Sequence, residues 1–172
     1  MPAIVYDTGA LLAAERRNPD FLALHDEVTG ARIRPIVPVA VLAQAWRGGP
    51  QHQISRVLKG CDILPDDQAT GRAAGVACAA SGTDDVVDAI VIATAVRHQA
   101  PVVTSDPGDL TRIADSIGVK IRLYTTETAA AALVLQTDDG LAAEAALAEP
   151  FEDLARAVQF HCGAATGRSR RL

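Results

Sequence analysis

Aspartates stand at three places in the sequence where they could hold a divalent metal ion. Asp7 follows the apolar run of residues 3–6, and Asp106 follows the apolar run of residues 101–105. Asp88 lies near the start of a third apolar segment. Cations such as Mg²⁺ prefer oxygen ligands and are commonly held by one or two carboxylates together with waters. A divalent ion held in this way can activate a water and stabilise in-line attack on a phosphodiester. That chemistry is typical of nucleases.

The helix predicted over residues 83–99 carries acids only at its start. At 100° per residue, Asp84, Asp85 and Asp88 fall within about 100° of one another. We interpret Asp84 as a helix cap, because an acid there satisfies free N–H groups. Asp88 has apolar neighbours on both sides, so its carboxylate is expected to be partly desolvated and to need a partner. Since no Lys or Arg lies nearby in the sequence, a cation shared with the other two aspartates is the simplest partner.

The elements around these acids predict a parallel sheet. The apolar runs at residues 3–6 and 101–105 are typical of strands buried on both faces. Strands that alternate with helices indicate a parallel sheet covered on both sides, and ligands bind at the carboxyl ends of such strands. Further strands are predicted at residues 34–37, 61–64 and 119–124. Helices are predicted at residues 8–16, 19–29, 38–46, 66–81, 83–99 and 107–117, with another that ends near residue 58.

The composition is that of one main domain with an appendage. The chain has 172 residues and only 3% aromatic residues, so its core must be built from Ala, Val, Leu and Ile. This favours helices packed on a sheet. The net charge of −5 argues against a broad basic surface that holds nucleic acid. It is compatible with a carboxylate site, where a bound cation reverses the local charge.

Neither the cysteines nor the N-terminus indicates an extracellular protein. The three cysteines are widely spaced and lack a CxxC pair, which indicates neither a disulfide framework nor a zinc site. The first residues show no basic region followed by an apolar run. No stretch approaches the roughly 18 apolar residues that a membrane span needs. We therefore expect a soluble, cytoplasmic protein.

Four motifs in this order resemble those of PIN-domain ribonucleases, and among them the VapC-type toxins of bacterial toxin–antitoxin pairs. They are IVYDT at residues 4–8, VPVAVLAQAWRGG at 37–49, TDDVVDA at 83–89 and VVTSDPGDL at 102–110. The resemblance covers about residues 3–125. It implies a three-layer α/β/α domain over residues 1–126, with a mostly parallel sheet of four to five strands. Residues 127–172 would then form a C-terminal helical extension of unknown role.

Carried over position by position, the resemblance implies that Asp7, Asp88 and Asp106 are the catalytic, metal-binding acids. It also implies Mg²⁺ or Mn²⁺ as cofactor, an RNA substrate, a homodimer, and a cognate antitoxin that covers the site. Supporting roles would fall to the hydroxyls of Thr8 and of Thr104 or Ser105, with Asp85 and Asp109 as accessory acids.

Gln44 departs from the pattern, since the family often has a Glu in this helix. An amide oxygen can coordinate weakly but adds no charge, so we predict weaker affinity for a second metal ion. Gln44 also favours an alternative, a degenerate PIN-like module that binds RNA or protein without cutting. A phosphatase with Asp7 as nucleophile is a further alternative. Against it, the sequence lacks the second Asp, two residues on, that such enzymes use.

Trp46 and Arg47 precede a predicted tight turn. Packing of the indole and a favourable charge at a helix C-terminus explain them, and a phosphate contact by Arg47 is the alternative.

In the tail, the apolar spacing from Phe151 to Val158 predicts a short amphipathic helix that docks on the domain or on a dimer partner. The alternative is that arginines near the C-terminus reach the acidic site and inhibit it.

Overall fold

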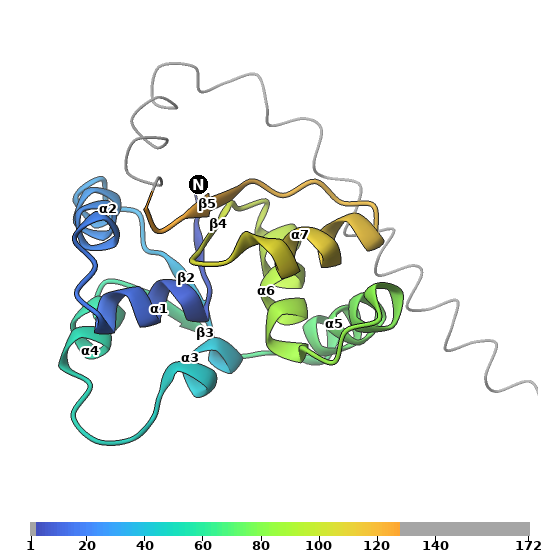
Figure 1. Cartoon of the computed structure of the whole chain (residues 1–172), viewed down its shortest axis with the longest axis horizontal. Helices are drawn as coiled ribbons and strands as arrows, with labels where there is room; N and C mark the ends of the chain where they lie inside the picture. Colours follow the sequence, from blue (N-terminus) through green and yellow to red (C-terminus); the bar gives the residue numbers. More distant parts are fainter. Residues whose placement is uncertain (1–2, 128–172) are drawn as a thin grey trace, which may run out of the picture.

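The computed structural model describes residues 3–127, so all of the predicted extension except Glu127 lies outside the described residues. A five-stranded sheet forms its centre (Figure 1), with strand order β3-β2-β1-β4-β5 and every neighbouring pair parallel. The strands are β1 (Val5–Tyr6), β2 (Ile36–Pro38), β3 (Asp62–Leu64), β4 (Val102–Thr104) and β5 (Leu123–Thr125). The predicted α/β fold is confirmed, and the sheet is entirely rather than mostly parallel.

Helices cover both faces of this sheet and complete the three layers. In Figure 1, α1, α2 and α4 lie on one side, and α5, α6 and α7 pack together on the other. The helices are α1 (Thr8–Glu15), α2 (Pro19–Gly30), α3 (Val39–Ala45), α4 (His52–Leu58), α5 (Gln68–Ser81), α6 (Val86–His98) and α7 (Pro107–Ser116). None of the helices in residues 3–127 is long and apolar enough to cross a membrane.

The core is aliphatic and surrounds the three central strands. β1, β2 and β4 are buried throughout, whereas the edge strand β3 exposes Asp62 and Ile63. Helix α6 is buried at every residue from Ala89 to Val96, which explains why its sequence is apolar almost all round. His25 is also a core residue, stacked against Phe21. A sheet held on both faces gives the ends of β1 and β4 fixed positions.

Helix α6 begins later than the sequence predicts. Its first residue is Val86, and its N-cap is Asp85 rather than Asp84, because the Asp85 side chain accepts the bond from the Asp88 N–H. The interpretation of Asp84 as the cap is therefore wrong. Asp88 therefore lies in the first turn of α6, whereas a helix that began at residue 83 would place it more than a turn from the start.

The last strand also begins later, at Leu123 instead of residue 119. The N–H of Val119 bonds back to the carbonyl of Ala114, and Gly118 takes a left-handed conformation with φ of 71°. These residues close the C-terminal end of α7. The chain reaches the sheet only afterwards, where the Val102 N–H bonds to the Arg122 carbonyl.

Candidate active site

Asp7 occupies the carboxyl end of the central strand and is only 6% exposed. It is the N-cap of α1, and its Oδ1 accepts a hydrogen bond of 2.8 Å from the Ala10 N–H. Burial raises the pKa of this carboxyl from 3.8 to about 6, and the charge of Asp106 adds to the rise. Hydrogen bonds from Thr104 and from backbone N–H groups oppose it. Asp7 is thus a buried acid whose charged form the protein stabilises only in part.

Asp106 comes from the neighbouring strand and meets Asp7 through the sheet register. Tyr6 pairs with Val103, so the residues that follow, Asp7 and Thr104, reach the same edge. Asp106 is the N-cap of α7, and its Oδ1 accepts a bond of 3.1 Å from the Gly108 N–H. The Asp106 N–H in turn donates to the Thr104 hydroxyl at 3.0 Å. The buried Thr104 hydroxyl therefore contacts both strand-end acids.

Asp88 brings the third acid from α6. It is half-buried, and burial is the main cause that raises its pKa from 3.8 to about 6. The remaining causes are negative charges, in decreasing order those of Asp85, Asp7, Asp109 and Asp106. The four other predicted acids therefore lie close enough to Asp88 to act on its carboxyl. Carboxylates gathered in this way repel one another unless a cation joins them.

Lys and Arg side chains neutralise little of the negative charge of these acids. The ion pairs within residues 3–127 join Arg34 to Asp62, Arg97 to Asp67 and Arg112 to Asp109. The last pair, 3.0 Å long, involves an exposed accessory acid and leaves Asp7 and Asp88 without a Lys or Arg partner in the described part of the chain. An exposed pair of this kind contributes little to stability.

Gln44 and Thr8 form one wall of the site. The Thr8 hydroxyl hydrogen-bonds to Oε1 of Gln44, which ties α3 to the first turn of α1 directly after Asp7. The position that often carries a family Glu therefore lies beside the acids, and its amide oxygen is already engaged. Ser105 is exposed and makes a different contact, with Gly9.

Gly9 is a site residue that sequence reasoning missed. A Cβ on it would lie 2.2 Å from the Ser105 Oγ and 2.7 Å from the Ser105 backbone nitrogen. Real Cβ atoms do not approach so closely, so only glycine lets α1 pack against the loop after β4. The signal available in the sequence was a glycine two residues after a strand-end acid.

The donor set is of the kind that Mg²⁺ and Mn²⁺ take, namely carboxylate oxygens with room for waters. Within residues 3–127, no three acidic, His or Cys side chains stand in the arrangement of a direct metal-binding group. A cation bound by one or two of the carboxylates and completed by waters fits these residues.

The described part of the chain also has a small cavity. This cavity lies at the other end of the sheet and is not part of the candidate active site. Its lining includes Gln99, Pro101, Val119 and Arg122.

Residues 4–116 match the family model of the PIN domain. The chain belongs to the PIN domain family. PIN domains are typically nucleases, and they generally use divalent metals. A comparison of this chain with curated proteins found no match.

Solved structures share the fold over 72% of this chain. Similar ones include VapBC2 from Rickettsia felis bound to a DNA fragment from its promoter (15% identity, TM-score 0.54, 98% of that chain covered). Others are FitAB bound to the IR36 DNA fragment (16%, 0.52, 95%) and FitAcB from Neisseria gonorrhoeae (16%, 0.52, 97%). At such identities the likeness shows the fold alone.

Proposed function

We propose that this PIN domain is a metal-dependent endoribonuclease and the toxin of a toxin–antitoxin pair. The observation that carries the proposal is the group of acids at one edge of the sheet. Asp7 and Asp88 have pKa values raised to about 6 and no cationic side-chain partner among residues 3–127. Buried carboxylates need a compensating charge, and a divalent cation would supply it.

Each residue would contribute a separate part of the reaction. Asp7, Asp88 and Asp106 would hold Mg²⁺ or Mn²⁺, one or two of them directly and the rest through its waters, and the ion when bound supplies an activated water and neutralises charge on the phosphate. Thr104 orients the Asp7 carboxyl through its hydroxyl. Asp85 positions Asp88 by accepting its backbone N–H at 3.0 Å.

The toxin role rests on the resemblance of four sequence motifs to those of VapC-type toxins, and VapBC2 and FitAB share the fold. VapBC2 and FitAB are each described as bound to DNA fragments. By analogy we propose a cognate antitoxin that covers the acids and a homodimer of the toxin, both in the cytoplasm. Induced expression in bacteria should stop growth, and sequencing of RNA ends shortly after induction should reveal the target.

The direct test is RNA cleavage by the purified full-length chain. Cleavage should require Mg²⁺ or Mn²⁺ and stop with EDTA. Asp7→Asn, Asp88→Asn and Asp106→Asn should each abolish it, because they remove a ligand charge while keeping the shape of the side chain. Asp115→Asn, at the far exposed end of α7, is the matched control and should cleave normally.

A second candidate is a PIN-like module that binds without cutting, which Gln44 favours because it adds no charge at the wall of the site. RNA binding without cleavage at any Mg²⁺ or Mn²⁺ concentration would establish it. The phosphatase alternative finds no support in the geometry. Its second acid would have to stand at Gly9, where the contact with Ser105 leaves no space for a side chain.

A further inference from the structure

Trp46 is on the surface, which the sequence did not predict. It caps the C-terminal end of α3 and is 41% exposed. The other Phe and Tyr side chains of residues 3–127, at positions 6, 21 and 124, are buried or partly buried. The remaining large apolar side chains that are exposed in this part of the chain are aliphatic: Val39, Ile63 and Val86. The indole of Trp46 is therefore not part of the hydrophobic core of residues 3–127.

The indole is presented on a braced turn. The buried Gln51 side chain accepts the Arg47 N–H at 2.9 Å and reaches the Ala45 carbonyl at 3.4 Å, so it ties the two ends of the loop together. Between them, Gly48 and Gly49 both have φ of 76°, a backbone conformation that residues other than glycine rarely adopt. A side chain on such a turn needs little ordering when it binds a partner.

The turn begins beside the acids. Gln44 bonds to Thr8, the residue after Asp7, and two residues of chain reach at most about 7 Å. Trp46 therefore leaves α3 next to the wall of the candidate active site. The turn therefore lies within reach of a substrate whose phosphate is bound at the acids.

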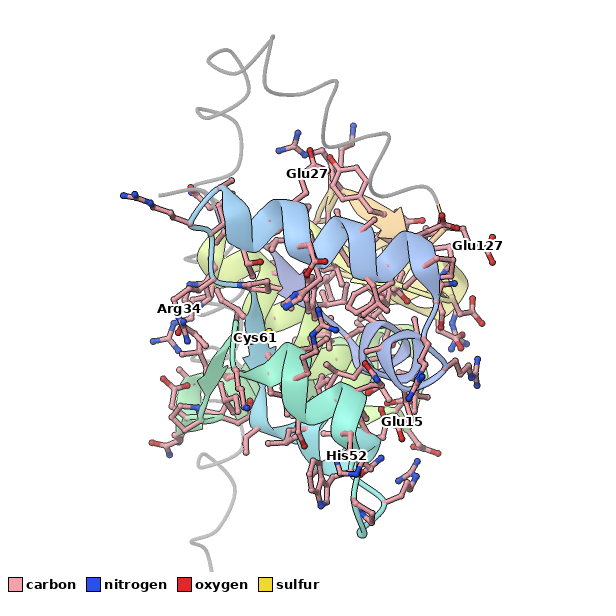
Figure 2. The ribbon with its side chains drawn as sticks, turned by 90° about the vertical axis from the view of Figure 1, so that its left-hand side faces the viewer. Glu15, Glu27, Arg34, His52, Cys61 and Glu127 are labelled. Atoms are coloured by element: carbon pink, nitrogen blue, oxygen red, sulfur yellow. The ribbon has the colours of Figure 1, made fainter. Side chains whose placement is uncertain are left out.

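The segment that continues from Trp46 is basic, although the chain as a whole is acidic. Residues 46–60 contain Arg47, Arg56 and Lys59 and no Asp or Glu. On α4, His52, Arg56 and Lys59 share one exposed face, opposite the buried Ile54 and Val57. Figure 2 shows α4 at the surface, with His52 labelled. Arg47 is exposed and forms no ion pair with any residue of the described chain.

We propose that Trp46 stacks on an unpaired base of a single-stranded RNA and that Arg47, with the cationic face of α4, contacts its phosphates. Aromatic faces next to basic grooves are the usual means of holding single-stranded nucleic acid. This inference rests on the proposed function and adds the form of the substrate and the residues that position it. Trp46 and Arg47 are positioning residues, since neither is among the reacting groups.

The sole tryptophan makes the proposal directly measurable, because tryptophan fluorescence excited beyond the absorption band of the two tyrosines reports on Trp46 alone. A short single-stranded RNA is titrated into the full chain in EDTA, where no cleavage occurs. We expect saturable quenching by this RNA and little quenching by the same sequence as a duplex. Inorganic polyphosphate, which has charge but no bases, should not quench.

Variants separate stacking from charge. With labelled RNA, Trp46→Ala should weaken binding about 5- to 150-fold, and Trp46→Phe should retain most of it. Ile63→Ala removes an exposed aliphatic group and is the control. Arg47→Gln should reduce the slope of log affinity against log salt by about 0.7, whereas Arg72→Gln on α5 should not. In cleavage assays Trp46→Ala should raise KM and leave kcat nearly unchanged.

The outcomes distinguish this proposal from the proposed function. Cleavage with no quenching, and with equal RNA affinity in Trp46→Ala, overturns the stacking proposal and leaves the nuclease in place. It would then assign the exposed indole to a protein contact. Quenching and a Trp46-dependent affinity without cleavage support the RNA platform and overturn the nuclease. Quenching by polyphosphate equal to that by RNA would also refute stacking.

Discussion

Replacing Asp7 by Asn should stabilise the metal-free protein at neutral pH. The pKa of Asp7 is raised from 3.8 to about 6, chiefly by burial. A tenfold change in proton affinity is worth about 1.4 kcal/mol, so keeping this buried acid charged costs about 3 kcal/mol. Asn removes the charge and can still cap α1, because its side-chain oxygen accepts the same N–H bond.

The sign of the pH dependence follows from the raised pKa. The folded protein binds the Asp7 proton more tightly than the unfolded chain, so protonation favours folding. The contribution that protonated Asp7 makes to the free energy of unfolding at low pH is lost as pH rises from about 4 to about 6. The advantage of Asp7→Asn should therefore grow over this range and level off above about pH 7, at a value approaching 3 kcal/mol.

Urea unfolding of the full-length chain in EDTA, at intervals from pH 4 to pH 8, measures this difference. Asp115→Asn is the control and should show no such growth. Excess Mg²⁺ should stabilise the wild type and leave Asp7→Asn nearly unchanged, because binding to the folded state alone adds stability. The reasoning is refuted if Asp7→Asn is less stable than the wild type at pH 7.5 in EDTA, or if its advantage is the same at every pH.

Three further changes test the surroundings of the acids. Gln44→Glu should tighten the Mg²⁺ dependence of cleavage and of thermal stability, because it adds a ligand charge; an unchanged metal titration would contradict this. Thr104→Val removes the hydroxyl that favours charged Asp7, so the pH at which the Asp7→Asn advantage levels off should move upward, and a fixed value would exclude that role. Gly9→Ala should destabilise by about 1 to 3 kcal/mol, since its Cβ would clash with the Ser105 backbone. A Cβ at Gly71 on α5 would meet open space, so the control Gly71→Ala should instead stabilise the protein by about 0.5 to 1 kcal/mol. If the two substitutions shifted the urea midpoint equally, the clash at Gly9 would be ruled out.

The sequence predicted the strand-end acids because each follows a continuous apolar run, and a parallel sheet brings such ends to one edge. It also predicted that Asp88 would be partly buried. It could not choose the cap of α6, since Asp84 and Asp85 are adjacent and either could serve. In the structure the Thr83 N–H still bonds to the Cys78 carbonyl at the end of α5, and α6 begins only after Asp85.

Two features depend on contacts between distant parts of the chain, and local patterns do not reveal them. Gly9 is required by the loop that carries Ser105, almost a hundred residues later. The exposure of Trp46 depends on the turn that Gln51 braces. An apolar pattern predicts burial for an indole at the end of a helix, so the pattern was wrong at the residue that we now propose meets the substrate.

Three of the site acids also begin helices, since Asp7, Asp85 and Asp106 cap α1, α6 and α7. Under the proposed function, selection acts on these side chains in two ways, one through chemistry and one through folding. A descendant that stopped cutting RNA would still need a capping residue at each position, and Asn, Ser or Thr would suffice. Substitution of Asp by these neutral caps would mark lost catalysis in a lineage whose fold persists, whereas substitution by aliphatic residues would also cost about 0.5 to 2 kcal/mol of stability at each cap.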